Sequence, residues 1–367
     1  MKWLRYIVPL VALVVTMTGI TPDAEAGAVS QQFAKNDFLK LPEWAVTASG
    51  YGGKLLLSDS PETVTADGIM YQDTVKGDAR LFFHHVNGTD KPKKIVVLLE
   101  NTGTEPVHIT VSQYGLGGPG LNYLAVGKTA QMAYLKGGDL YLVEVSPQGT
   151  AELAVGLSSI IVEPNALVNG IYDFSADQPV KVKTIMLPVN EDIEKFAAQA
   201  KVLPADQYKL RGTFDNKDRL LVPVNVYNAK DDGMVAVTLA DNKIDRYVKG
   251  VDATDGSQVL NYGNYGVVYK LFIPSSALDN KLSCYLNPRG GEYAGGLGVK
   301  YRYHEQPVLA TPSDRLSFGV HGSTDAAFIG AFDGGQSLWL TFSPPGASNL
   351  PVKLVIAPGL AAAVHGS

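Results

Sequence analysis

Two glycine-rich segments in the second half of the chain place tyrosines beside amide and guanidinium groups. Residues 261–266 read Asn-Tyr-Gly-Asn-Tyr-Gly, and residues 287–293 read Asn-Pro-Arg-Gly-Gly-Glu-Tyr. A tyrosine ring offers a flat apolar face, while amides and guanidinium groups give directed hydrogen bonds, which suits glycan or peptide binding. The alternative is that these tyrosines pack a sheet edge and the glycines serve the turns. The predicted ligand-binding residues are Tyr262, Asn264, Tyr265, Arg289 and Tyr293.

Signatures of catalysis are missing from the sequence. It contains neither the G-x-S-x-G nucleophile elbow nor S-x-x-K. A glycosidase needs two carboxylates about 5 to 9 Å apart, and the sequence does not single out such a pair among 36 acidic residues. We therefore expect a non-catalytic protein and assign no catalytic residue. The alternative is an extracellular enzyme on cell-wall or carbohydrate substrates, which a cleft with paired carboxylates of perturbed pKa would support.

No arrangement of residues predicts a bound metal. His84 and His85 are neighbours, so on a strand they point to opposite faces and cannot bind one ion together. His84 could join His108 only if their two strands pair. An acidic run holds Asp241, Asp245, Asp252 and Asp255, but its spacing does not match an EF-hand loop, and a solvated acidic turn is the preferred interpretation. We therefore expect no cofactor, with calcium as the alternative.

A glycine-rich segment at residues 115–120 matches the G-x-G-x-x-G dinucleotide pattern. The pattern requires a helix that opens at once and a βαβ unit around it. Pro119 interrupts the segment, and we expect no such unit after it, so we interpret it as a loop of a β-sandwich. The later run Val126-Gly127-Lys128-Thr129 lacks the glycine that a phosphate-binding loop needs at position 122, which is Asn122.

Short apolar runs with period-two alternation dominate the chain, cut by Gly, Pro, Asn and Asp. This pattern predicts an all-β fold of two antiparallel, Ig- or jelly-roll-like sandwich domains. Residues 190–202 carry a helical apolar face between two prolines, and they predict a short helical connector. The predicted parts are a signal peptide at 1–26, an N-terminal segment at 27–50, domain 1 at 51–187, the connector at 188–207, domain 2 at 208–358 and a tail at 359–367.

The first 26 residues resemble a cleavable export signal. Lys2 and Arg5 precede an apolar run, and Ala24-Glu25-Ala26 forms a small-x-small cleavage site. The run is shorter than the roughly 20 residues that span a bilayer. We therefore predict cleavage after Ala26 and a secreted, extracytoplasmic protein that has no membrane span after cleavage and is free or non-covalently attached to the envelope.

Composition limits the partners and the source of stability. The formal net charge is −5, which gives no attraction to nucleic acid. The chain has one cysteine, Cys284, so no intrachain disulfide is available, and its strand-like neighbours predict a buried, inert thiol. The apolar cores must therefore stabilise the fold alone.

Three segments carry a resemblance to a protein group: residues 262–271, 286–291 and 344–352. They look like segments of uncharacterised exported β-sandwich proteins of Gram-positive-type bacteria, some of which carry a copper-amine-oxidase-like N-terminal repeat. The pattern of that repeat is not visible here, so neither copper nor amine oxidation is carried over. Together with the tyrosine segments, the resemblance implies an exported binding or structural protein of the cell envelope, with a cell-wall glycan or an envelope protein as its partner.

Overall fold

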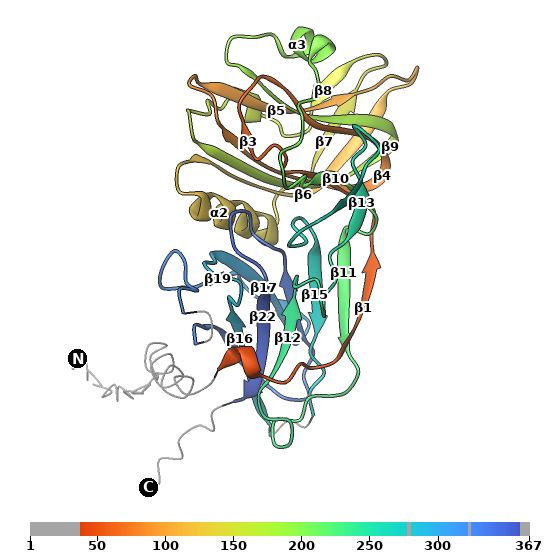
Figure 1. Ribbon diagram of the computed structural model, residues 1–367. Coiled ribbons are helices and arrows are strands. Elements are labelled where there is room, and N and C mark those ends of the chain that lie inside the picture. The colour runs from red at the N-terminus through yellow and green to blue at the C-terminus, as the bar shows by residue number, and fades with distance from the viewer. Residues whose placement is uncertain (1–36, 277–279, 322–323, 360–367) are drawn as a thin grey trace, which may run out of the picture. The chain divides into compact units, whose positions relative to one another are not determined.

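The computed structural model describes residues 37–276, 280–321 and 324–359, and strands dominate it (Figure 1). Strand accounts for 49% of the structure and helix for 8%, which confirms the all-β class. The predicted cleavage site at Ala26 lies outside the described residues. Within the described ranges, no helix combines the length and apolar character needed to cross a bilayer.

The largest sheet has eleven strands. Its main path runs through β14 (Gln258–Leu260), β13 (Lys249–Val251), β10 (Arg211–Phe214), β2 (Lys54–Ser58), β4 (Gly68–Asn87), β9 (Leu167–Pro188), β5 (Lys93–Glu100) and β8 (Thr150–Glu152). β3 (Thr63–Val64) joins β4, while β6 (Val107–Gly120) pairs with both β9 and β7 (Tyr141–Val145).

The long strand β9 makes this sheet fold over itself. One edge of β9 pairs with β4 along nearly its whole length. The other edge pairs first with β6, through residues 167–176, and then with β5, through residues 181–188. Because two different strands follow one another along the same edge, the sheet curls around an apolar core. This core includes Leu56, Leu81, Phe83, Val97, Ile109 and Phe174.

Two smaller sheets make up the rest of the fold. The seven-stranded sheet contains β1 (Val46–Tyr51), β11 (Asp218–Pro223), β15 (Val268–Phe272), β21 (Leu338–Phe342), β17 (Gly295–Tyr301) and β18 (His304–Glu305), with β19 (Leu309–Thr311) paired to β17. The four-stranded sheet contains β12 (Val235–Leu239), β22 (Val352–Pro358), β16 (Lys281–Asn287) and β20 (Ala327–Asp333). Cys284 on β16 is buried as predicted, and burial raises the pKa of its thiol to about 12.

The side chains on the two faces of β2 pack into two different cores, so this strand links the large sheet to the smaller ones. Leu56 points into the core of the large sheet, whereas Leu55 and Leu57 belong to the core shared with the smaller sheets. Strand pairing also crosses the predicted connector, because β10 joins β2 in the large sheet and β1 joins β11 in the seven-stranded sheet. The finer prediction, two sandwiches separated at residues 188–207, is therefore not confirmed by the pairing.

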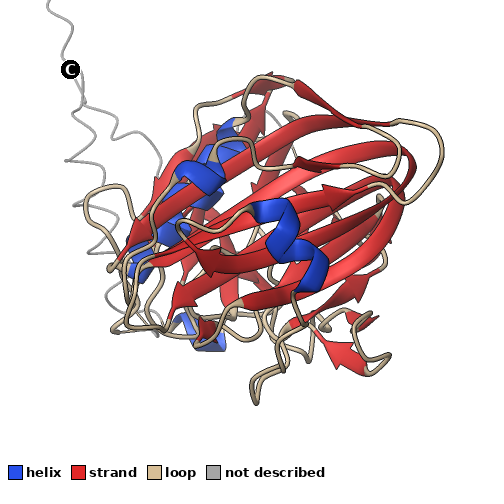
Figure 2. Cartoon of the chain, turned by 90° about the horizontal axis from the view of Figure 1, so that it is seen from above, coloured by secondary structure: helices blue, strands red, loops and turns tan. Residues whose placement is uncertain are grey.

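The helix α3 (Ile193–Gln199) confirms the predicted helical segment but is shorter. Its N-cap is Asp192, whose side chain accepts from Lys195 N. Phe196 and Ala197 contact the outer face of β5 and β9, so α3 covers the strands when the fold is seen from above (Figure 2). The described residues also form two 3-10 turns, η1 (Phe38–Lys40) and η2 (Leu157–Ser159).

The interpretation of residues 115–120 as a loop is wrong, and a helix follows them. These residues extend β6, and the helix α2 (Tyr123–Lys136) begins after the N-cap Asn122. A Cβ at Gly115 or Gly117 would lie 2.1 Å from a helix carbonyl, so these glycines let α2 lie directly on the strand. β6 and β9 are antiparallel, so the segment is not part of a βαβ unit. The glycines therefore serve packing.

Candidate functional site

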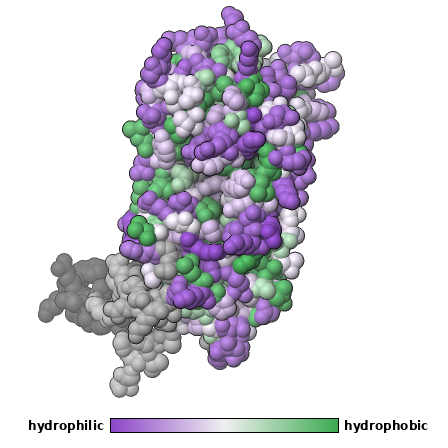
Figure 3. Space-filling model, viewed as in Figure 1, coloured by the Kyte–Doolittle hydropathy of each residue, from purple (hydrophilic) through white to green (hydrophobic). Residues whose placement is uncertain are grey.

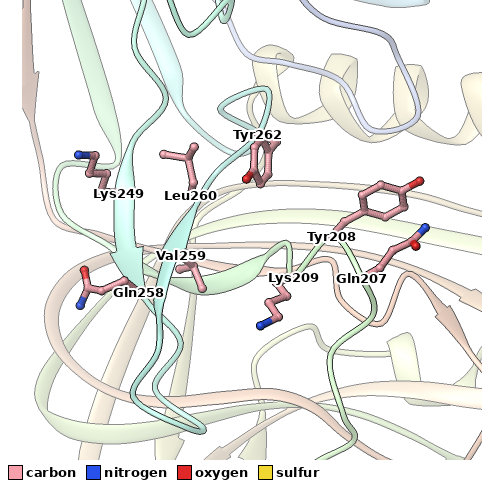
Figure 4. Close-up of a pocket in the computed structure, with 8 residues that line it drawn as sticks. All are labelled: Gln207, Tyr208, Lys209, Lys249, Gln258, Val259, Leu260 and Tyr262. Atoms are coloured by element: carbon pink, nitrogen blue, oxygen red, sulfur yellow. The ribbon is translucent and has the colours of Figure 1, made fainter.

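A pocket of about 510 Å³ opens beside the hairpin of β13 and β14 (Figure 4). Its volume falls within the range of small-ligand sites, roughly 300–1,000 Å³. Two chain segments border it, residues 207–209 and the hairpin with the turn that follows. We call it the tyrosine pocket, and its lining residues are Gln207, Tyr208, Lys209, Lys249, Gln258, Val259, Leu260 and Tyr262.

The turn at residues 261–266 is held by its own side chains. Asn261 Nδ2 donates to Tyr265 O at 2.8 Å, and Asn261 Oδ1 accepts from Tyr265 N at 2.9 Å. Gly263 has φ 92° and Asn264 has φ 53°, a conformation that glycine and asparagine adopt more readily than other residues. The repeated Asn-Tyr-Gly motif therefore specifies a closed turn.

Asn264 ties this turn to the rest of the fold. Its Oδ1 accepts from Val248 N at 2.9 Å, and its Nδ2 donates to Tyr269 Oη at 2.7 Å. Tyr269 Oη in turn donates to Asp245 Oδ2 at 2.6 Å. Asn264 is completely buried, and its amide is used by these bonds. The Asn264 side chain therefore positions the turn and cannot reach a ligand.

Tyr262 is presented on the outside of this rigid turn. Its ring is 52% exposed, whereas Asn261, Gly263 and Asn264 beside it are buried. The Tyr247 ring meets the Tyr262 ring edge-on, with centroids 5.8 Å apart. The structure therefore fixes an aromatic side chain in solvent at the edge of the pocket, supported from one side.

The opposite border of the pocket is fixed by Asp206. Its Oδ1 accepts from Tyr208 N at 2.9 Å and from Lys209 N at 3.1 Å. Its Oδ2 accepts from Glu62 N at 2.9 Å. Tyr208 is 61% exposed, and Lys209 has φ 53°, an uncommon value for lysine. Figure 4 places Tyr208 and Tyr262 toward one end of the pocket and Lys249 toward the other.

The charge lining the tyrosine pocket has one sign. Its described lining contains Lys209 and Lys249 but no carboxylate, and Gln207 and Gln258 add amides. Neither lysine ammonium group has an ion-pair partner within the described ranges. The pocket thus combines aromatic faces, amides and two unpaired cations.

The other predicted ligand residues do not join Tyr262 in this pocket. Tyr265 is half-buried and donates from Oη to Ser348 O at 2.8 Å. Tyr293 is fully buried, with its ring 6.0 Å from that of Phe318. Arg289 lies 3.6 Å from a carboxylate oxygen of Asp241. The sequence interpretation missed Tyr208 and the lysines, because isolated residues in a turn or at the end of a short strand carry no motif.

The carboxylates of the acidic run bind groups of the protein itself. Asp241 Oδ1 accepts three backbone N–H groups, from residues 243 to 245. Burial alone would raise the pKa of Asp241, but these N–H groups and Arg289 hold it below its usual value. Asp252 pairs with Arg211 at 2.7 Å. Among the described residues, no group of three or more acidic, histidine or cysteine side chains is arranged to hold a metal.

The histidines stand apart, as their positions on strands predict. His85 lies 2.8 Å from Ser58 Oγ, and His84 lies on the other face of β4. Burial lowers the pKa of His84 to about 3 and that of His85 to about 4, so both are neutral at pH 7. His108 lies on β6, which pairs with β9 and β7, and its Nδ1 is 2.9 Å from Asp177. The pairing between the strands of His84 and His108 that a shared site would require is not formed.

A second pocket, of about 260 Å³, contains a buried ion network instead of a reactive pair. Arg80 is 1% exposed and contacts Asp173 through two nitrogens, at 2.6 and 2.8 Å. Arg80 also lies 2.9 Å from Asp218, and Lys217 lies 3.0 Å from Asp173. Burial alone would raise the pKa of Asp173, but Arg80 and Lys217 hold it below its usual value. A carboxylate that is held ionised in this way cannot serve as a general acid.

One carboxyl group has the opposite environment. Asp59 is buried, and within the described residues its Oδ1 atom has no hydrogen-bond partner. Burial raises the pKa of Asp59 well above its usual value, and the charges of Glu62 and Asp206 raise it further. Burial and Asp206 also raise the pKa of Glu62. Asp59, Glu62 and Asp206 thus lie next to the segment that carries Tyr208, since Asp206 accepts from the backbone of both Glu62 and Tyr208.

Comparisons with known proteins do not assign the chain to a family. No family model matches it, and no curated protein matches it. The CUB1-EGF-CUB2 domain of human MASP-1/3 aligns over 78% of this chain and 99% of its own, with 8% identity and a TM-score of 0.21. The CBM22-1-CBM22-2 tandem domain from Paenibacillus barcinonensis aligns over 88% and 94%, with 8% identity and a TM-score of 0.14. Likeness this low carries no argument, so function must be argued from the tyrosine pocket.

Proposed function

We propose that this protein is an exported, non-catalytic binding component of the bacterial cell envelope that recognises glycan through the tyrosine pocket. One observation carries the proposal. Tyr208 and Tyr262, which are 61% and 52% exposed, line the same pocket, and side-chain hydrogen bonds fix the backbone beneath each of them.

A rigid exposed tyrosine is suited to bind the apolar face of a sugar ring. The ring of the tyrosine loses little conformational freedom on binding, and a fixed backbone removes most of the remaining ordering cost. Gln207 and Gln258 can donate to and accept from sugar hydroxyls. Polar residues cover most of the face seen in Figure 3 and apolar ones are scattered, so no broad apolar patch there competes as a binding surface.

Export to the envelope is the part of the proposal that rests on sequence. The charged start, apolar run and small-x-small site at residues 1–26 support it. The envelope offers a dense supply of polysaccharide, which a modest pocket can bind at many places on one polymer. A partner peptide is the competing ligand, and it would pair with the backbone of β14, an end strand of the large sheet.

A second candidate function is an extracellular enzyme acting on cell-wall or other carbohydrate. Asp59 supports it, because a buried carboxyl with a raised pKa is what a general acid requires. Hydrolysis would release new reducing ends from a bound polysaccharide, and Asp59→Asn would abolish that release. Under the binding proposal the protein releases none.

The test is retention on purified cell-wall polysaccharide and on a glycan array. The protein is compared with Tyr262→Ala and with Tyr303→Ala, a matched control because Tyr303 is 80% exposed and does not line the pocket. We expect Tyr262→Ala to weaken binding about tenfold, which is the usual cost of truncating an aromatic anchor, above about 1 kcal/mol. Tyr303→Ala should bind like the unmodified protein.

Three outcomes would overturn the proposal. The first is the absence of binding to every glycan tested. The second is equal binding by Tyr262→Ala and the unmodified protein. The third is glycan cleavage that depends on Asp59, which would replace binding by catalysis.

A further inference from the structure

The unpaired cations of the tyrosine pocket suggest the kind of glycan that it binds. Lys209 and Lys249 both line the pocket, and neither ammonium group has an ion-pair partner within the part of the chain that the structure describes. By contrast, Lys300 near the end of β17 lies 3.3 Å from Glu305. The chain carries more acidic than basic residues, so a pocket lined by cations alone stands out.

Two carboxylates near Lys209 already have other partners. Asp206 accepts the backbone N–H groups of Tyr208 and Lys209. Asp255 lies near enough to Lys209 for their charges to interact, but its Oδ1 accepts from Ser257 N at 2.8 Å. The two ammonium groups therefore remain available to a negatively charged group from outside.

The backbone at Lys209 holds the lysine in place. Lys209 O accepts from Arg211 N at 2.8 Å, and φ at Lys209 is 53°. Residues other than glycine pay for this conformation, which persists when surrounding contacts enforce it and which gathers at functional sites. Figure 4 shows the Lys209 side chain on the border formed by residues 207–209, apart from Lys249 on the hairpin.

We propose that the ligand is an anionic glycan, whose sugar rings stack on Tyr262 and Tyr208 while separate carboxylate or phosphate groups contact Lys209 and Lys249. This inference rests on the proposed glycan-binding function and adds the charge of the ligand. Carboxylate and phosphate share the chemistry that a lysine recognises, a negatively charged oxygen that accepts from the ammonium group.

The experiment measures affinity for three defined oligosaccharides by calorimetry. They are a trigalacturonate, the neutral galactose trimer and a phosphorylated galactose trimer, which separate carboxylate, neutral and phosphate ligands. Short oligomers are used because a long polymer would add avidity to each contact. The protein is compared with Lys209→Gln/Lys249→Gln and with Lys243→Gln, which changes an exposed lysine outside the pocket lining.

We expect at least one acidic trimer to bind more tightly than the neutral one. The double variant should lose about tenfold in affinity for that trimer, which corresponds to two exposed charge contacts, and should bind the neutral trimer as before. Raising the salt concentration should weaken binding of the acidic trimer to the unmodified protein and leave its binding to the double variant nearly unaffected. Lys243→Gln should match the unmodified protein.

The two proposals fail in different ways. Tyr262-dependent binding of the neutral trimer, with no preference for either acidic trimer, would overturn the anionic ligand and leave glycan binding intact. Unchanged affinity of the double variant for the acidic trimers would have the same meaning. Lysine-dependent binding that Tyr262→Ala does not weaken would overturn stacking on the pocket and with it the proposed function.

Discussion

Replacement of Arg80 by methionine should destabilise the fold strongly. Arg80 is 1% exposed, and it donates to Asp173 through two nitrogens, to Lys217 O at 2.7 Å and to Tyr134 Oη at 2.8 Å. The variant would leave the negative charges of Asp173 and Asp218 buried without the positive charge of Arg80 beside them. Removing one partner of a buried ion pair costs about 3–5 kcal/mol in the free energy of unfolding.

The assay is thermal unfolding followed by circular dichroism. At about 2–4 °C per kcal/mol, Arg80→Met should lower Tm by about 10 °C. The control is Lys300→Met, which breaks the exposed pair between Lys300 and Glu305 and should change the free energy of unfolding by less than about 1 kcal/mol. A Tm of Arg80→Met equal to that of the control would refute the reasoning, because the network would then contribute no more than a surface pair.

The pH dependence of this effect has a definite sign. Arg80 and Lys217 lower the pKa of Asp173 in the folded protein, although burial alone would raise it. The ionised carboxylate therefore stabilises the fold at pH values above the unfolded pKa of about 3.9, and this contribution is lost as pH falls through the lower folded pKa. The Tm difference between Arg80→Met and the unmodified protein should stay constant from neutral pH to about pH 5 and narrow only in stronger acid.

Two further substitutions test the same physical reasoning. Burial raises the pKa of Asp59, so the fold loses stability as pH rises from the unfolded pKa of about 3.9 towards the higher folded pKa. Asp59→Asn should therefore raise Tm at pH 7 but not in acid, and an unchanged Tm at pH 7 would contradict the assignment. Gly117→Ala should lower the free energy of unfolding by about 1–3 kcal/mol or more, because its Cβ would lie 2.1 Å from Val126 O. Gly120→Ala is the matched control in the same strand, since its Cβ meets a side-chain methyl at 3.0 Å; equal melting of the two variants would count against close packing of α2.

The predicted all-β class followed directly from alternation. β6 buries Val107, Ile109 and Val111 and turns His108 outward, as period two requires. The turn at residues 261–266 is also local, because Asn261 bonds within the turn and Gly263 supplies the positive φ. Features of this kind depend on neighbours along the chain, which a sequence displays.

The helix α2 shows where local reasoning failed. Its buried positions are Val126, Gly127, Ala130, Gln131 and Tyr134, a helical face in which glycine, alanine and glutamine stand among few large apolar residues. Gly127 permits Gly346 O to approach the helix, since a Cβ at residue 127 would lie 1.8 Å from that oxygen. The helix is specified by close packing on both sides, and close packing cannot be seen in the sequence of one segment.

By itself, the sequence determined the strand character of the chain and the closed Asn-Tyr-Gly turn, and it predicted Tyr262 as a ligand residue. Only the tertiary structure decided that Tyr293 is buried and that Tyr208, Lys209 and Lys249 join Tyr262 around one pocket. The reason is that alternation and turn geometry act over a few residues. Which strands pair, and hence which side chains remain exposed together, depends on packing between residues far apart in the chain.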